Sequence, residues 1–187
     1  TLLITDRAGP LALAAIMGGE ISSCTDATRD VFLESAFFAP AGIAGRARRY
    51  GLQTDSSYRF ERGVDSRLQR RAAERATRLL IDIAGGQPGP IIEAVSPEHL
   101  PAEPTIRLRP ERIRKLLGLE ISVPEVEEIL RRLGMAVAAE PDHWLVAPPS
   151  SRFDIALEAD LIEEIARIYG YDRLPGNRPL TRLEMPP

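Results

Sequence analysis

The stretch GLQTDSSYRFERGVD, residues 51–65, decides how the first half of this chain is organised. Short polar side chains that both donate and accept hydrogen bonds lie here between two glycines, directly before a run with helical periodicity. Hydroxyl groups such as those of Thr54 and Ser56 can line a pocket and hold a water molecule. The same residues also suit an Asp/Ser turn followed by a helix N-cap. The residue types alone leave both interpretations open.

Downstream of this stretch, the pattern predicts a helix over residues 65–84. Apolar residues repeat there at helical spacing. Gly85 and Gly86 are expected to end the helix, and Pro88 prevents its continuation.

Upstream, the sequence predicts two short buried strands, at residues 2–4 and 11–16. Gly18 and Gly19 follow the second strand, and glycine allows a close approach of the backbone. Glu34 is a lone carboxylate between the apolar runs 31–33 and 36–38. It fits either an acceptor set among apolar side chains or a surface glutamate on an edge strand.

The second half of the chain has a different pattern of apolar residues, which predicts shorter helices and strands. We expect strands at 106–108, 135–139 and 144–147 and helices at 110–117, 123–133 and 157–169. Ser122 and Glu125 are predicted to form a capping box at the start of the second of these helices. Trp144 and Tyr169 are expected in the core.

These elements predict an α/β (α+β) domain followed by a small α+β domain that resembles a winged helix. The expected divisions are a first domain at 1–96, a proline-rich linker at 97–103, a second domain at 104–174 and a connecting tail at 175–187.

Composition excludes several classes of protein. The chain is 44% apolar and 27% charged, which is ordinary for a globular protein. No run approaches the roughly 20 apolar residues of a membrane span, and no leader with a charged and then an apolar part opens the sequence. The single cysteine, Cys24, cannot form an internal disulfide. We therefore expect a cytoplasmic protein.

Charge is distributed unevenly along the chain. Between Arg46 and Arg78, ten arginines face four acidic residues. Arginine pairs bidentately with phosphate, so Arg46, Arg48 and Arg49 are candidate contacts to a nucleic acid, although a solvated helix face is the simpler explanation.

Four carboxylates near the end of the chain form a second candidate site: Asp154, Asp160, Glu163 and Glu164. The last three share one helix face at i, i+3 and i+4. Oxygen ligands without histidine or cysteine suit Mg²⁺ rather than zinc. A solvated acidic face fits the same residues.

Several blocks, in order and in register, closely resemble the beta subunit of bacterial phenylalanyl-tRNA synthetase. They are IMGGE at 16–20, LESAFFAP at 33–40, TDSSYRFERGVD at 54–65, ATRLL at 76–80, and SRFD at 151–154 with IYGYD at 168–172. Ser66 departs from the family, which usually has proline there. The chain is thus identified as an internal piece of that subunit, spanning most of its B3/B4 editing domain, truncated at the N-terminus, and its B5 domain.

The resemblance implies hydrolytic editing of tyrosyl-tRNA(Phe). A pocket shaped for phenylalanine cannot strongly reject tyrosine, which merely adds a hydroxyl, so a second site must read that hydroxyl. In the family, the glutamate matching Glu34 recognises it, Thr54 and Ser56 match positions lining the editing pocket, and Gly18 and Gly19 fall where backbone approaches the substrate. No histidine or cysteine lies nearby, so hydrolysis by a positioned water is expected, with backbone and hydroxyl groups polarising the ester.

The resemblance also implies partners and cofactors. The positions matching the four carboxylates bind Mg²⁺ in the family, shared with the catalytic alpha subunit, and tRNA(Phe) is the other expected partner. The parent ligase uses ATP, but this chain lacks the parts for that step and should not aminoacylate. Two alternatives stay open. One is a noncatalytic fragment that binds tRNA or a partner. The other is a DNA-binding module, against which the acidic helix at 123–133 argues.

Overall fold

The computed structural model describes residues 1–176, which divide into two compact units. The first contains Thr1–Ala102 together with Ser150–Phe153, and the second contains Glu103–Pro149 and the chain from Asp154 onward. Helices and small antiparallel sheets occur in both, which confirms the predicted α+β class. No helix within residues 1–176 is both long and apolar enough to cross a membrane. Most of the predicted tail, 175–187, lies outside the described residues.

A three-stranded antiparallel sheet opens the first unit. Its strands β1 (Leu3–Thr5), β2 (Pro10–Leu13) and β3 (Met17–Gly18) pair in the order β1-β2-β3. The predicted burial of the first strand is wrong, because Leu2 and Leu3 are 49% and 44% exposed. The buried residues Ala14 and Ile16 lie instead in the turn between β2 and β3. The sequence did not predict β3 as a strand, since its two residues carry too little periodicity.

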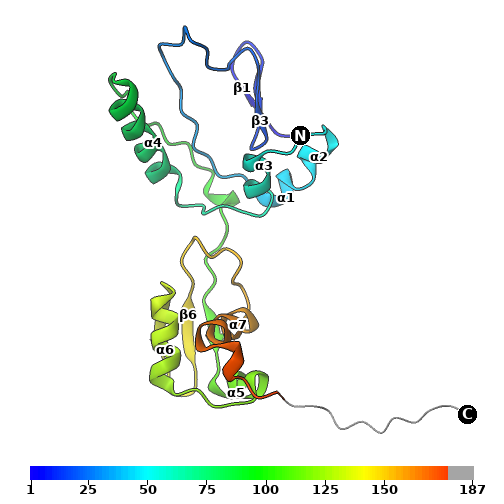
Figure 1. Ribbon diagram of the computed structural model, residues 1–187, viewed down its shortest axis with the longest axis vertical. Helices are drawn as coiled ribbons and strands as arrows, with labels where there is room; N and C mark the ends of the chain where they lie inside the picture. Colours follow the sequence, from blue (N-terminus) through cyan, green and yellow to red (C-terminus); the bar gives the residue numbers. More distant parts are fainter. Residues whose placement is uncertain (177–187) are drawn as a thin grey trace, which may run out of the picture. The chain divides into compact units, whose positions relative to one another are not determined.

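Four helices follow in the first unit. They are α1 (Pro40–Ile43), α2 (Arg46–Arg49), α3 (Asp55–Phe60) and α4 (Gln69–Ala84). Figure 1 shows α4 apart from the β1–β3 strands, with the chain between β3 and α1 running from one to the other. That connecting chain, which includes Glu34, has no regular secondary structure from residue 29 to residue 39.

Helix α4 differs from its prediction in two ways. It starts at Gln69 rather than at residue 65, because the Asp65 carboxylate accepts the Arg67 N–H at 2.9 Å and holds a turn there. Its end at Gly85 is confirmed. No α4 residue is buried, and Ile83 is 83% exposed despite the amphipathic pattern. The apolar periodicity of the sequence predicted the helix, but it did not reveal whether another element covers the apolar face of that helix.

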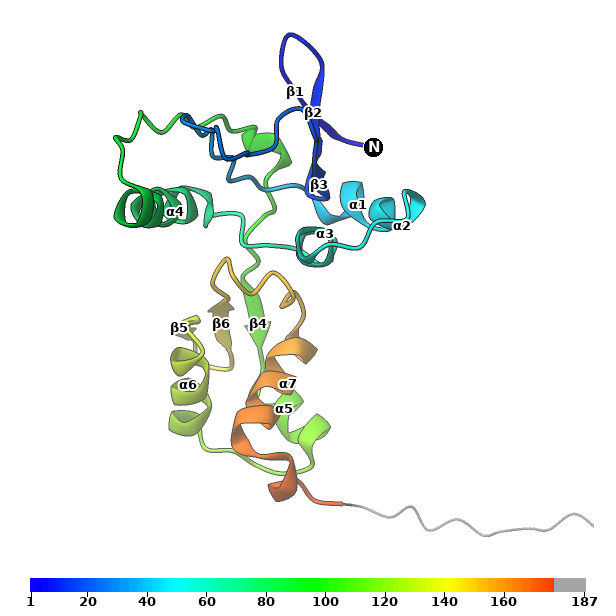
Figure 2. The same cartoon turned by 45° about the horizontal axis from the view of Figure 1, so that its top comes forward.

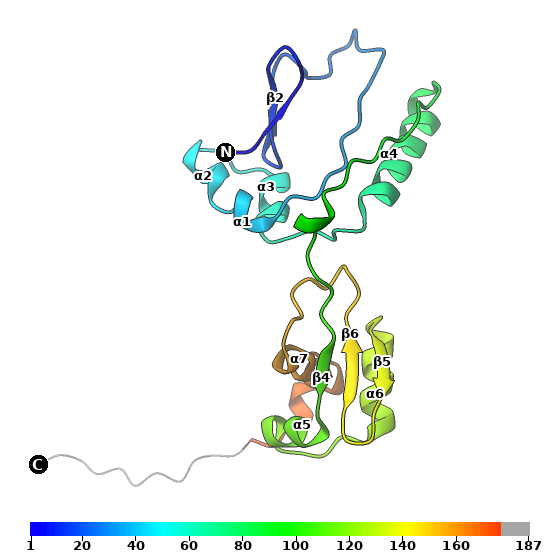
Figure 3. The same ribbon diagram turned by 180° about the vertical axis from the view of Figure 1, so that it is seen from behind.

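The second unit places three helices on one face of a three-stranded sheet. Strands β4 (Ile106–Leu108), β6 (Trp144–Ala147) and β5 (Ala136–Ala139) pair antiparallel in that order. Helices α5 (Pro110–Leu117), α6 (Val123–Arg132) and α7 (Glu158–Tyr169) lie over the sheet in Figure 2, and Figure 3 shows the opposite face uncovered. Short 3₁₀ turns occur at Pro97–His99 and Tyr171–Arg173.

The hydrophobic core of the second unit lies between these layers. Alternation along the strands explains it: Trp144 and Val146 of β6 are buried, while Leu145 and Ala147 are only partly covered. The remaining buried members come from β4, all three helices and the loops. The predicted core positions of Trp144 and Tyr169 are confirmed, with Tyr169 packed at the margin.

The capping box predicted at the start of α6 is wrong. Ser122 is the N-cap residue of α6, but its side chain makes no capping hydrogen bond. The capping box expected from Ser122 and Glu125 is therefore absent among the described residues.

Candidate functional site

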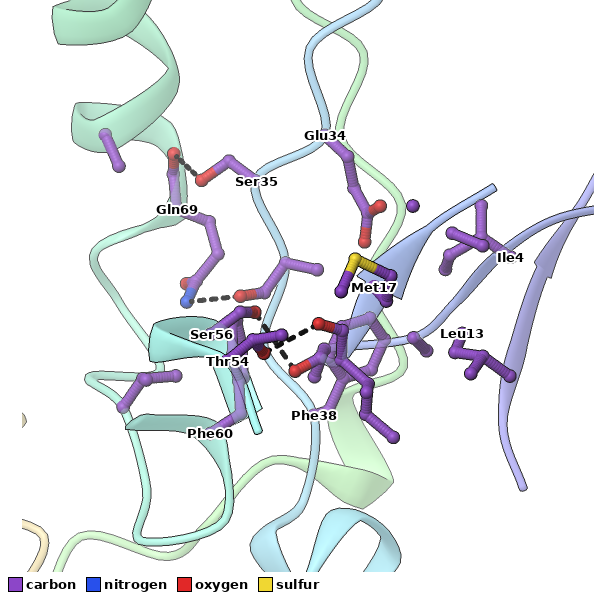
Figure 4. A pocket seen from close by; sticks show the side chains of 18 of the residues that line it. Ile4, Leu13, Met17, Glu34, Ser35, Phe38, Thr54, Ser56, Phe60 and Gln69 are labelled. Atoms are coloured by element: carbon purple, nitrogen blue, oxygen red, sulfur yellow. Dashed lines mark hydrogen bonds between the residues drawn. The ribbon is translucent and has the colours of Figure 1, made fainter. Parts of the chain in front are cut away.

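A pocket of about 560 Å³ lies in the first unit, between the β2–β3 turn, the extended segment around Glu34, and the start of α4. Volumes of this order suit small ligands. Four of the five predicted site residues line it: Gly18, Glu34, Thr54 and Ser56. Figure 4 shows the side chains of Glu34, Thr54 and Ser56 together with the apolar ones beside them. Tertiary structure thus brings together positions up to 38 residues apart in the sequence.

Helix α3 holds the polar side of the pocket. Thr54 is its N-cap, and Thr54 Oγ1 accepts the Ser57 N–H at 3.0 Å while Ser57 Oγ accepts the Thr54 N–H at 3.1 Å. This capping box was not recognised in the sequence, because serine replaces the usual glutamate or glutamine at N3. The simpler interpretation of residues 51–65, a turn with an N-cap, is therefore part of the structure of the pocket.

The hydroxyls of Thr54 and Ser56 also fasten α3 to the sheet. Thr54 Oγ1 donates to the Ile16 carbonyl at 2.8 Å, and Ser56 Oγ donates to the Ala15 carbonyl at 3.0 Å. A hydroxyl has one proton, so neither group can also donate to an ester carbonyl in this conformation. Polarisation of an ester by these hydroxyls is therefore not supported, whereas their lone pairs can still orient a water molecule.

Replacing Thr54 by valine should destabilise the first unit by about 1–2 kcal/mol, because the change removes an N-cap and a tether to Ile16 while keeping the side-chain shape. Urea unfolding would measure the loss, and amide exchange should show the Ser57 N–H losing protection. Thr77→Val in α4 is the matched control, because the Thr77 side chain makes no hydrogen bond within residues 1–176. Equal stability of the two variants would contradict this role of Thr54.

Glu34 occupies the opposite side of the pocket. Its carboxylate points into the pocket toward the Met17 thioether (Figure 4). Partial burial raises the pKa of Glu34 above its ordinary value of 4.5. Within residues 1–176 the Glu34 side chain makes no hydrogen bond or ion pair. An acceptor in this position remains available to a ligand.

The two predicted glycines have different surroundings. A Cβ on Gly18 would meet nothing within 4 Å, so Gly18 leaves open space at the pocket wall. A Cβ on Gly19 would lie 2.6 Å from the Leu11 carbonyl oxygen, to which the Gly19 N–H donates at 2.7 Å. Gly19 is not among the residues that line the pocket. It permits the close backbone contact with Leu11 that continues the pairing of β2 and β3.

Apolar residues that the sequence interpretation did not single out form much of the wall. The rings of Phe38 and Phe60 pack against each other with centroids 5.6 Å apart, and Met17 lies above them in Figure 4. Phe38 lies in the same sequence block as Glu34, and Phe60 lies in the same block as Thr54. This proximity in the sequence could have indicated that both rings belong to the pocket. A long apolar wall with one free carboxylate suits a ligand that has an aromatic body and a polar end.

The four carboxylates of the second predicted site are not arranged as a metal centre. Asp160 Oδ2 accepts the N–H groups of Ala156 and Leu157, at 2.9 and 2.8 Å, which caps α7. Glu164, 8% exposed, pairs with Arg167. No group of three or more His, Cys, Asp or Glu side chains in the described chain could hold a metal ion. The Mg²⁺ site at these four residues stays a prediction.

The three candidate arginines lie on the four-residue helix α2. Arg48 and Arg49 are exposed, while Arg46 is partly buried. The left-handed Gly45 precedes them, which lets the chain turn sharply between α1 and α2. Their exposure is compatible with contacts to a nucleic acid, which stay a prediction.

Comparison with family models finds two matches along the chain. Residues 1–85 match the B3/4 domain, and residues 106–171 match the tRNA synthetase B5 domain. The first match contains every residue of the pocket, and the second contains the sheet and helices of the second unit.

Relatives match over nearly the whole chain. A phenylalanine–tRNA ligase beta subunit from Methylococcus capsulatus is 61% identical over 186 residues, which are 100% of this chain and 24% of that protein. The subunit from Nitrosococcus oceani is 58% identical over 98% of this chain and 23% of its own length. The subunit from Coxiella burnetii is 59% identical over 93% and 22%. The chain therefore spans about a quarter of the relatives it matches, and it belongs to the phenylalanine–tRNA ligase beta subunit family, as a segment built from a B3/4 domain and a B5 domain.

Proposed function

We propose that the pocket of the first unit hydrolyses tyrosyl-tRNA(Phe), as the editing site of a phenylalanine–tRNA ligase. The observation that supports this most is the Glu34 carboxylate, which has no partner within residues 1–176 and points into a pocket with an apolar wall. A tyrosine ring would lie against Phe38 and Met17, and its hydroxyl would donate to Glu34. Glu34 is exposed in the free pocket. A bound phenylalanine would cover its carboxylate without pairing it, which is costly.

Hydrolysis would proceed by a bound water molecule. Its oxygen would attack the ester carbonyl carbon, and the bond to the terminal ribose oxygen would break. One proton of the water would pass to that ribose oxygen, so that tyrosine and a tRNA with a free terminal hydroxyl would leave. The lone pairs of Thr54 Oγ1 and Ser56 Oγ can accept hydrogen bonds from this water, since their own protons are donated to backbone carbonyls. Gly18 leaves room for the aminoacyl group.

The other parts of the proposal concern the whole ligase. Its tRNA would approach near α2, where Arg48 and Arg49 are exposed. The alpha subunit would be the second partner, and ATP would be used elsewhere in the parent enzyme, in the cytoplasm. The carboxylates around α7 would be the place for Mg²⁺ only after their present hydrogen bonds are rearranged.

A noncatalytic role in binding tRNA or a partner is the second candidate. It is favoured by the bare apolar face of α4, none of whose residues is buried in the described chain. A site that needs a partner against this face would not work in the isolated segment.

A deacylation assay distinguishes the two candidates. Tyrosyl-tRNA(Phe) would be incubated with the 187-residue chain and, in parallel, with a full-length ligase containing this segment. We expect hydrolysis by the full-length enzyme that falls by about tenfold to about a hundredfold on Glu34→Ala. Hydrolysis by the full-length enzyme alone would place the isolated segment in the noncatalytic class. Full activity of the Glu34→Ala ligase would refute the proposed editing pocket.

A further inference from the structure

The segment that carries Glu34, residues 31–38, makes very few hydrogen bonds to the rest of the described chain. Residues 31–38 form neither helix nor strand, and Phe32 is 91% exposed. Within residues 1–176, the segment makes only two hydrogen bonds, and both go to one residue, Gln69 at the start of α4. Besides the packing of Phe38 against Phe60, the hydrogen bonds to Gln69 therefore hold the segment that places the Glu34 carboxylate in the pocket.

Both bonds are to residues that directly follow Glu34. Ser35 Oγ donates to the Gln69 carbonyl at 2.9 Å, and Gln69 Nε2 donates to the Ala36 carbonyl at 3.4 Å. The same amide group donates to the Asp65 carbonyl at 2.8 Å. One side chain thus fixes the turn before α4 and the extended segment at once, and Figure 4 shows its bond to the segment beside Ser35.

The chemistry of an amide explains why glutamine suits this position. Its two N–H protons serve two backbone carbonyls, which a carboxylate or an apolar side chain of the same length cannot do. The Leu68 N-cap makes no side-chain capping bond to α4, and the Gln69 amide bond to the Asp65 carbonyl helps to hold the turn before the helix.

We propose that Gln69 and Ser35 are positioning residues for Glu34 in the editing pocket. The inference rests on the proposed function of that pocket. Glu34 has no hydrogen bond of its own within the described chain, so the two bonds between residues 35–36 and Gln69 set the distance from its carboxylate to a bound ring. A polar contact that reads a single hydroxyl is sensitive to misplacement by about 1 Å.

The test uses Gln69→Met and Ser35→Ala in a full-length ligase containing this segment. Methionine has nearly the length of glutamine but no N–H donor. Hydrolysis of tyrosyl-tRNA(Phe) and of phenylalanyl-tRNA(Phe) would be measured for each variant under single-turnover conditions. We expect the tyrosyl rate to fall about tenfold while the phenylalanyl rate changes little, so that the ratio of the two rates falls about tenfold. Ser35→Thr keeps the hydroxyl and should restore the ratio.

Two controls keep the outcomes separate. Gln87→Met makes the same substitution at an exposed residue after α4 and should leave the ratio unchanged. Glu34→Ala tests the pocket itself. If Glu34→Ala abolishes discrimination while Gln69→Met and Ser35→Ala keep the wild-type ratio, the positioning role is wrong and the editing function stands. If Glu34→Ala has no effect, the proposed function fails. A proportional fall of both rates would show a merely structural role. Should Gln69→Met fail to fold, the Ser35→Ala and Ser35→Thr pair decides.

Discussion

Replacing Glu34 by alanine in a full-length ligase containing this segment should lower the rate of tyrosyl-tRNA(Phe) hydrolysis between about tenfold and about a hundredfold. A hydrogen bond to a charged group contributes about 1.5–3 kcal/mol, and the change removes this contact from tyrosine. Glu34→Gln should fall between wild type and Glu34→Ala, because an amide oxygen still accepts but lacks the charge that strengthens the bond. Glu20→Ala is a matched control, since Glu20 is exposed and lies outside the pocket lining.

The pH dependence provides an independent readout of the same residue. Burial raises the pKa of Glu34 above 4.5, so the carboxylate accepts a proton at a higher pH than an exposed glutamate does. Tyrosyl-tRNA hydrolysis should therefore decline as the pH falls through this raised pKa, and the decline should vanish in Glu34→Gln. The pH dependence of folding stability has the opposite sign to that of hydrolysis. Protonated Glu34 favours the folded state, and this contribution is lost as the pH rises through the folded pKa. If the decline in hydrolysis at low pH persisted in Glu34→Gln, a group other than Glu34 would be its cause.

The second large effect is expected on stability, at Leu161 of α7. Its side chain is fully buried in the core of the second unit. Leu161→Ala should destabilise this unit by about 2–5 kcal/mol, because it removes apolar burial and leaves a cavity. Urea unfolding monitored by Trp144 fluorescence would measure the change, since Trp144 lies in the same core.

Leu116→Ala is the control for that measurement. Leu116 is 48% exposed on α5, so the same substitution should cost well under 1 kcal/mol there. Similar losses for the two variants would contradict the core as described.

Local sequence determined most of the second unit. The α5 range and its left-handed end at Gly118 follow from proline near the start of the helix and glycine after its end. The strands at 136–139 and 144–147 follow from two short apolar runs on either side of a Pro–Asp turn. The capping box expected at Ser122 and Glu125 is not formed, although both residue types are present, because residue type alone does not fix the side-chain orientation that the box requires.

The carboxylates of α7 show where pattern-based reasoning ends. Helical spacing put Asp160, Glu163 and Glu164 on one face, yet spacing does not reveal which groups are already occupied. Asp160 caps its own helix, and Glu164 pairs with Arg167. Hydrogen bonds with nearby backbone and side chains compete with a metal ion for the same lone pairs.

The sequence by itself determined the family, because blocks of residues recur in order, and it determined which hydroxyls and which carboxylate belong to the candidate site. Only the tertiary structure decided how they are used. Thr54 and Ser56 donate their protons to carbonyls of the β2–β3 turn. Gly19 allows a close backbone contact and does not line the pocket. Glu34 reaches the pocket on a segment that is hydrogen-bonded to Gln69. These contacts join residues 33 to 41 positions apart or depend on backbone proximity, and no local periodicity encodes either.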